Sequence, residues 1–227
     1  MPETRQAFHD ELDSIELEVL VEGELAERAI DRAVTALVTG DADLARLVIA
    51  EDDGVDERYL SVERRILQVL ALQTPVAGDL RRLSAILHIN LHLERIGDQA
   101  VNVAKIFLSV RDLPAGGTIL SHLHEMGDVV RAMIRTALTS LRDRDLDLAL
   151  SLPVMDDPVD RLNLGMYREV AMLASDAGML EWGLRMNVLA RQLERVGDNA
   201  VDIGEQVAFL VTGEFREFTD ASHPEAT

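Results

Sequence analysis

The side chains best suited to chemistry are acidic residues spaced four positions apart. They recur in two matching segments 100 residues apart, as Glu94, Asp98 and Asn102, and then as Glu194, Asp198 and Asp202. An α-helix turns by about 100° per residue, so positions i, i+4 and i+8 drift by only about 40° per step and share one face. Each segment therefore predicts a stripe of oxygen ligands along one helix.

A second acidic pair precedes each stripe. The pairs are Asp52 with Asp56 and, 104 residues later, Asp156 with Asp160. If the helices that carry a pair and a stripe pack antiparallel, four or five oxygens converge on one patch. Oxygen-only sites suit hard cations, so we predict ions of iron, manganese, magnesium or calcium there. The predicted metal ligands are Asp52, Asp56, Glu94, Asp98, Asn102, Asp156, Asp160, Glu194, Asp198 and Asp202.

A simpler interpretation of the acidic residues remains open. Carboxylates four apart on a charged protein are usually a solvated helix face, and Arg95 and Arg195 are available as ion-pair partners. Like charges at this spacing slightly destabilise a helix, and their repetition in both halves favours a counter-ion. Gly97 and Gly197 are poor helix formers within the stripes, and we interpret them as sites of close helix packing.

Composition excludes several classes of function. The chain of 227 residues carries 22 basic and 41 acidic side chains, and a net charge of −19 repels nucleic-acid phosphates. Cysteine is absent, which excludes disulfides and thiolate-bound metals. No apolar run is long enough to span a membrane, and the N-terminus does not resemble a signal peptide. We expect a soluble, cytoplasmic protein without direct nucleic-acid binding.

Nothing in the sequence indicates catalysis. A ferritin-like di-iron centre needs Glu-x-x-His pairs, and no glutamate is followed by histidine at that spacing. There is no glycine-rich phosphate loop and no arrangement typical of a serine or cysteine nucleophile. We therefore expect no catalytic residues and no organic cofactor.

Six long helices must position the acidic residues. Apolar spacing predicts them over about 8–38, 42–73, 75–110, 118–142, 146–177 and 180–212, with Asp41 capping the second helix and Gly54 interrupting it. Aromatic residues make up only 4% of the chain, so the core is aliphatic. The repeated acidic segments show that the six helices are two copies of a three-helix unit.

These features predict an all-α fold of two tandem antiparallel three-helix bundles, because short connections favour antiparallel neighbours. The first bundle covers residues 1–113 and the second residues 117–213, separated by a Pro-Ala-Gly-Gly linker. Residues 214–227 form a polar tail that we expect to be disordered.

The sequence resembles the PhoU family of phosphate-transport accessory and regulatory proteins over about residues 5–214. The matching segments are residues 5–9 (RQAFH) with 11–12 (EL), 72–81 (LQTPVAGDLR), 93–98 (LERIGD), 193–200 (LERVGDNA) and 210–214 (LVTGE). The resemblance implies two three-helix bundles whose Glu/Asp-x-x-x-Asp motifs hold metal ions, iron among them, at the positions given above. The second repeat departs from the pattern, since residues 177–180 (AGML) replace the Gln-x-Pro turn.

The resemblance also implies a role. It points to a non-enzymatic, cytosolic negative regulator that contacts subunits of the phosphate ABC transporter, and in many members a sensor histidine kinase as well. We expect a homodimer that reaches the membrane only through the transporter. The competing hypothesis is a metal-dependent helical-bundle enzyme or a metal store, which turnover assays with and without iron would distinguish.

Overall fold

The computed structural model describes residues 2–113 and 115–218, and within these ranges every regular element is an α-helix. This confirms the all-α prediction. The helices are α1 (Pro2–Thr39), α2 (Ala42–Ala50), α3 (Asp53–Gln73), α4 (Ala77–Val110), α5 (Thr118–Asp143), α6 (Leu146–Met172) and α7 (Ala177–Thr212).

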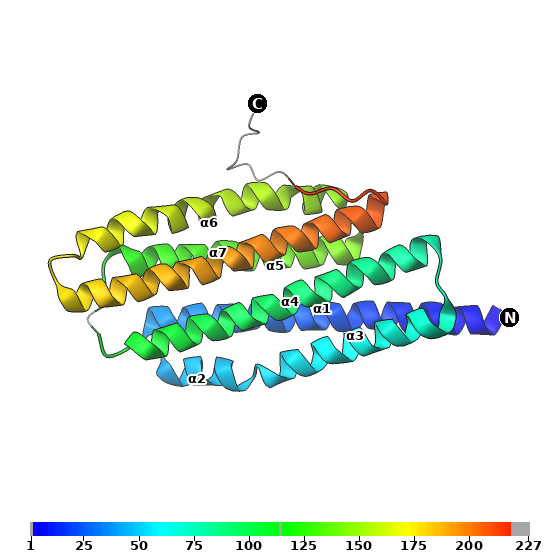
Figure 1. The fold of residues 1–227 in the computed structure, drawn as a ribbon, viewed down its shortest axis with the longest axis horizontal. Coiled ribbons are helices and arrows are strands. Elements are labelled where there is room, and N and C mark those ends of the chain that lie inside the picture. Colours follow the sequence, from blue (N-terminus) through cyan, green and yellow to red (C-terminus); the bar gives the residue numbers. More distant parts are fainter. Residues whose placement is uncertain (1, 114, 219–227) are drawn as a thin grey trace, which may run out of the picture.

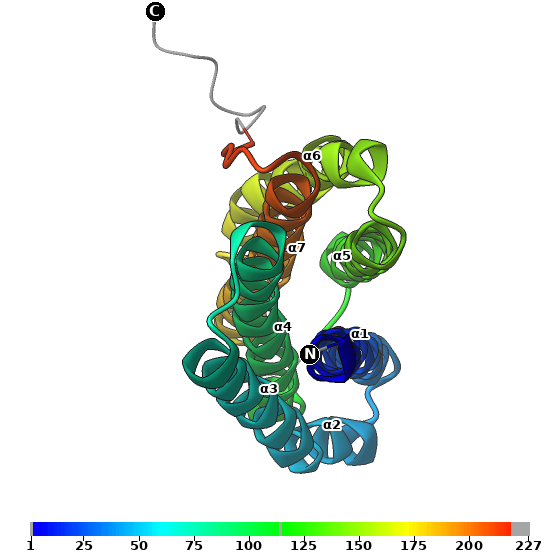
Figure 2. The ribbon, with the colours of Figure 1, turned by 90° about the vertical axis from the view of Figure 1, so that its right-hand side faces the viewer.

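The helices run back and forth along one long axis (Figure 1). Helices α1, α2 with α3, and α4 form the first bundle, and α5, α6 and α7 form the second, which confirms two tandem antiparallel three-helix bundles. Seen end-on, α6, α7, α4 and α3 form a curved row, and α1 and α5 lie along its inner side (Figure 2). The two bundles therefore meet through two helix pairs, α4 with α7 and α1 with α5.

Several helices begin where an aspartate caps the free N–H groups of the first turn. Asp41 accepts hydrogen bonds from the backbone N–H groups of Asp43 (3.0 Å) and Leu44 (2.9 Å), as the sequence predicted. Asp176 caps α7 in the same way, and α7 therefore begins at Ala177, three residues earlier than expected. Helix α4 begins at Ala77 rather than at Pro75, because Val76 is the extended N-cap residue.

The middle helix differs between the repeats. In the first bundle it is broken between Ala50 and Asp53, just before Gly54, whereas α6 continues through Pro153 and Pro158. The break divides the predicted helix 42–73 into α2 and α3. At the other end, α6 stops at Met172 rather than near residue 177, and α1 begins at Pro2 rather than at Phe8.

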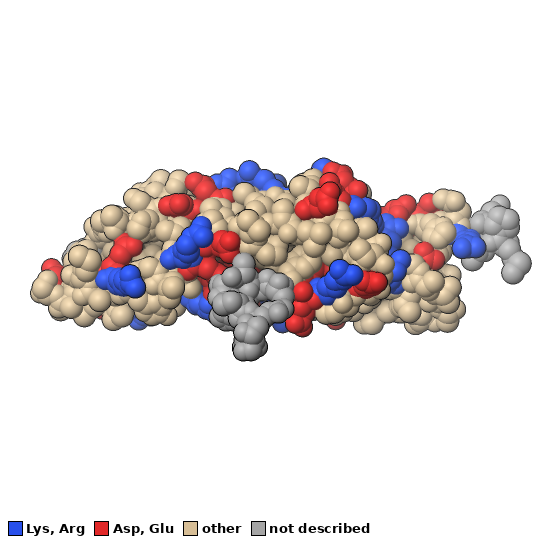
Figure 3. Space-filling view, turned by 90° about the horizontal axis from the view of Figure 1, so that it is seen from above, with Lys and Arg blue, Asp and Glu red and all other residues tan. Residues whose placement is uncertain are grey.

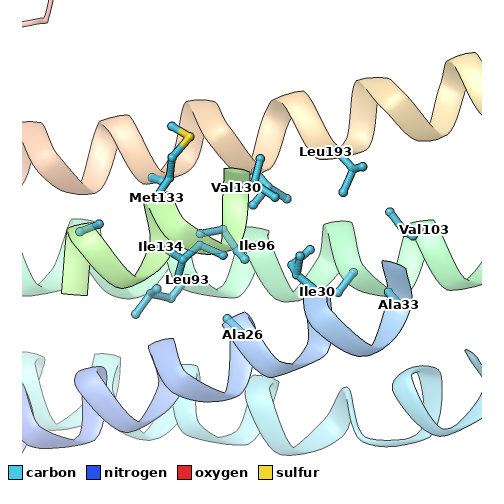
Figure 4. Close-up of a cluster of buried hydrophobic side chains, with 14 of the residues drawn as sticks. Ala26, Ile30, Ala33, Leu93, Ile96, Val103, Val130, Met133, Ile134 and Leu193 are labelled. Atoms are coloured by element: carbon cyan, nitrogen blue, oxygen red, sulfur yellow. The ribbon is translucent and has the colours of Figure 1, made fainter. Parts of the chain in front are cut away.

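The buried side chains form one aliphatic core that continues from one bundle into the other. Figure 4 shows the part shared by four helices. All of the labelled side chains have no solvent exposure: Ala26, Ile30 and Ala33 of α1, Leu93, Ile96 and Val103 of α4, Val130, Met133 and Ile134 of α5, and Leu193 of α7. Because burial of apolar area is the main stabilising term, the two repeats are expected to unfold together.

Glycines set the close approach of α1 to α5. A Cβ atom added to Gly23 would lie 2.3 Å from Leu138 Cδ2, and one added to Gly127 would lie 2.7 Å from Val34 Cγ1. Gly127 and Leu138 each follow their first-repeat counterparts, Gly23 and Val34, by 104 residues. The two contacts are therefore the same contact made twice, which shows that the repeats pack through a pseudo-twofold axis.

Past α7 the structure describes residues up to 218. The backbone N–H of Phe218 donates to a carboxylate oxygen of Glu205, so this segment contacts α7. The disorder expected for 214–227 otherwise concerns residues outside the described part. No helix in the described ranges is long and apolar enough to cross a membrane. Acidic and basic side chains are interspersed on the face shown in Figure 3.

Candidate functional site

In the first bundle the structure brings both acidic motifs together across the contact between α3 and α4. Burial raises the pKa of Asp52, and the charges of Asp56 and Asp98 raise it further. Burial likewise raises the pKa of Glu94, with Asp98 and Asp56 as the next contributions. Four predicted ligands thus share one patch, in which the neighbouring negative charges make Asp52 and Glu94 harder to ionise.

In the second bundle the equivalent residues lie deeper. Asp156 is 8% exposed and Glu194 is 7% exposed, whereas Asp198 is exposed and Asp160 is half-buried. Arg191 forms an ion pair with Glu194 from the same helix. The two sites therefore differ. Glu194 forms an ion pair with a guanidinium, whereas Glu94 forms no ion pair with any described residue, and burial and neighbouring carboxylates raise its pKa against the opposing charge of Arg95.

The last residue of each stripe lies at the interface between the bundles instead. The side-chain amide of Asn102 donates to Gln192 Oε1 (3.4 Å), and Asp202 Oδ2 lies 3.3 Å from His92 Nδ1. These contacts are equivalent, since Asp202 follows Asn102 by 100 residues and Gln192 follows His92 by 100 residues. Two steps of about 40° turn the third residue by about 80° from the first, which is enough to aim it at the neighbouring helix.

Metal binding remains a prediction. Across the described ranges, no group of three or more histidine, aspartate or glutamate side chains is arranged to hold a metal ion. The chemistry of the donor set in the first bundle still fits a hard cation, because four carboxylates share one patch and two have raised pKa values. A bound cation would require these side chains to turn towards a common centre.

The glycines of the two motifs allow close helix packing. A Cβ atom at Gly97 would lie 3.3 Å from Val55 Cγ1, and one at Gly197 would lie 2.1 Å from Asp156 Oδ1. The carboxylate of Asp156 thus lies directly against the backbone of α7. Gly197 is required because any larger residue would displace a buried carboxylate.

We predict that Gly197→Ala destabilises the protein by about 1–3 kcal/mol, the usual cost of overpacking a buried site. The matched control is Gly165→Ala in α6, where an added Cβ atom would meet nothing within 4 Å. That control should gain up to about 1 kcal/mol from helix propensity. Urea unfolding of the three proteins tests the prediction, and equal stability of the two variants would contradict it.

Glu22 is a residue of this site that the sequence analysis did not identify. It lies on α1 with no solvent exposure, and neither carboxylate oxygen has a hydrogen-bond partner among the described residues. Burial raises its pKa from 4.5 to about 8, the charge of Glu94 adds to the effect, and Arg58 opposes it. The pattern of α1 could have revealed it, since it occupies a core position between Val19 and Ala26.

Comparison with known proteins gives a consistent result for sequence and structure. The PhoU domain model matches residues 19–107 and again residues 123–207, once in each bundle. A Clostridium acetobutylicum protein named phosphate-specific transport system accessory protein PhoU homolog is 30% identical over 96% of this chain and its own full length. The Pseudomonas putida protein of the same name is 34% identical over 96% of this chain and 84% of its own.

Two solved structures of proteins named PhoU have the same fold as this chain. The crystal structure of PhoU from Pseudomonas aeruginosa has a TM-score of 0.86 at 32% identity, covering 91% of this chain and all of that one. The phosphate transport system regulatory protein PhoU from Streptococcus pneumoniae has a TM-score of 0.85 at 27% identity, covering 93% of this chain and all of that one.

Proposed function

Since the chain belongs to the PhoU family, we propose that it is a non-enzymatic, cytosolic negative regulator of phosphate uptake and of phosphate-starvation signalling. The observation that carries this proposal is the similarity to named accessory proteins of phosphate transport across both bundles. A match to one bundle alone would have supported only a shared helical module, because folds are reused for unrelated functions.

The proposed partner is the phosphate ABC transporter, which the protein contacts from the cytoplasm as an adaptor. A sensor histidine kinase is a second proposed partner, and the working form is proposed to be a homodimer. The net charge of −19 supports protein partners rather than nucleic acid or an anionic lipid surface, both of which it would repel.

The carboxylates are proposed to bind metal ions that adjust this adaptor. The first bundle is the better candidate, because Asp52, Asp56, Glu94 and Asp98 share one patch there. A cation would neutralise this patch and change the charge that the surface presents to a partner. In the second bundle, Arg191 already supplies a positive charge to Glu194.

We expect affinity-tagged protein, purified from phosphate-replete cells after gentle cross-linking, to bring down subunits of the phosphate ABC transporter. Mass spectrometry of the captured proteins checks this, with an equally acidic, unrelated helical protein carrying the same tag as the control. Recovery of transporter subunits at the level of that control would contradict the adaptor role.

A further inference from the structure

The first bundle contains a cavity that the function proposed above does not use. It has a volume of about 660 Å³ and opens between α1, the break between α2 and α3, and α4. Its apolar lining includes Ala29, Val48 and Val101, whereas Arg28, Arg58 and Ser61 provide hydrogen-bond donors. This volume lies within the range of about 300–1,000 Å³ that is typical of small-molecule sites.

The second repeat shows that the cavity is not a requirement of the fold. At the position equivalent to Ala29, 104 residues later, Met133 is fully buried in the core. The positions equivalent to Arg28, Arg58 and Ser61 hold Ala132, Leu162 and Gly165. The same three-helix unit therefore exists in this chain with a large apolar side chain and no donors at these positions.

The charges of the cavity leave two arginines available. Arg32 forms an ion pair with Glu51, and Glu18 forms one with Arg65, whose Nη1 lies 2.7 Å from Glu18 Oε2. Arg28 and Arg58 make no ion pair or hydrogen bond with any side chain in the part of the chain that the structure describes, although the charge of Arg58 lies close enough to Glu22 to lower the pKa of that carboxyl group. In a chain with 41 acidic residues, two arginines beside one cavity that form no ion pair favour an anionic ligand.

Two further acids, Asp52 and Glu57, also line the cavity. The pKa of Asp52 is raised by burial and then by Asp56 and Asp98, so this residue belongs to the neighbouring acidic patch. Glu57 is exposed to solvent, as are Arg28 and Arg58. Guanidinium groups suit phosphate in particular, because their planar N–H donors can bond two of its oxygens at once.

We propose that this cavity binds a phosphorylated small molecule of about nucleotide size. Arg28 and Arg58 bind its phosphate, Ser61 donates a further hydrogen bond, and the surface formed by Ala29, Val48 and Val101 contacts its apolar or aromatic part. The site lies in the first bundle alone. It stands independently of the partners proposed above, since it rests on the cavity and its charges.

Isothermal titration of the full chain with AMP and with inorganic phosphate tests the proposal. AMP is expected to bind, and Ala29→Met, which introduces the residue of the second repeat, should weaken binding by about tenfold or more by filling the cavity. Arg28→Gln combined with Arg58→Gln should weaken it to a similar extent. Arg64→Gln combined with Arg185→Gln removes the same charge from exposed positions elsewhere and should leave the affinity within about twofold.

Each outcome decides the proposal. Loss of AMP binding in both cavity variants, with the control pair unaffected and all proteins folded by circular dichroism, supports it. Absence of AMP binding to the wild type overturns it, as does equal binding by the wild type and Ala29→Met. Equal affinity for inorganic phosphate and AMP overturns the role of the apolar surface, because phosphate alone cannot contact it.

Discussion

Glu22→Met is expected to stabilise the protein at pH 7 by on the order of 3 kcal/mol, the largest single-residue effect that we expect. The pKa of Glu22 rises from 4.5 to about 8 on folding, chiefly through burial. A pKa difference of about 3.5 units corresponds to several kcal/mol of differential stability. Methionine is the residue at the equivalent position of the second repeat, Met126, where it is fully buried.

The pH dependence of this effect has a definite sign. Below pH 4.5 the carboxyl group is neutral in both the folded and the unfolded chain, so its ionisation costs nothing. As the pH rises from 4.5 towards 8, the unfolded chain releases the proton and the folded chain retains it, which lowers the free energy of unfolding. The advantage of Glu22→Met over the wild type should therefore grow across this window and level off above about pH 8.

Urea unfolding from pH 4.5 to 9 measures this difference. Glu24→Met removes a carboxylate from an exposed position of the same helix and is the control, expected to change stability by less than about 0.5 kcal/mol at any pH. A difference between the wild type and Glu22→Met that stays constant with pH would show that Glu22 is ionised in the folded protein.

Metal binding predicts the second large effect. A cation that binds only the folded protein raises its stability by about 2.7 kcal/mol at a hundredfold excess over Kd. After stripping with chelator, the wild type should melt higher when Mn²⁺ or Fe³⁺ is added. Replacing Asp98 and Asp198 together by Ala removes an oxygen ligand from each stripe and should largely abolish this response.

The same double substitution should also affect the stability of the metal-free protein. Because it removes a negative charge that raises the pKa of Asp52 and Glu94, the metal-free variant should lose little stability or gain some. Asp53→Ala combined with Asp157→Ala alters neighbouring acids outside the stripes and should keep the full metal response. Equal stabilisation of all three proteins, or of none, would mean that the stripes are only solvated faces.

The helices could be predicted from the sequence because their signals are local. Asp41 caps the second helix as predicted, and the apolar spacing of the core is regular along each helix. The cap at Asp176 was not predicted, and α7 therefore begins earlier than expected. The break before Asp53 and the continuity of α6 through Pro158 could not be predicted in the same way. Local propensity disfavours proline within a helix more than glycine. The helix that contains Gly54 is nevertheless broken, whereas α6 continues through its prolines, so tertiary packing outweighs propensity here.

The site was predictable in part for a similar reason. The four-residue spacing correctly grouped Glu94 with Asp98 and Asp52 with Asp56, since each pair is close on its own helix. It could not show that α7 lies beside Asn102, because that contact joins residues far apart in the sequence. Glu22 also lies four residues from another acid, Glu18, and only the packing of α1 shows that Glu22 is buried among apolar side chains.

The most direct test of the regulatory role is the rate of phosphate uptake in a clean deletion of the gene, measured with radiolabelled phosphate in phosphate-replete cells. We expect faster uptake and excess intracellular phosphate or polyphosphate, with phosphate-starvation genes expressed despite ample phosphate. A plasmid copy of the wild-type gene should restore the normal rate. Unchanged uptake, phosphate content and starvation-gene expression in the deletion strain would contradict the role proposed for this protein.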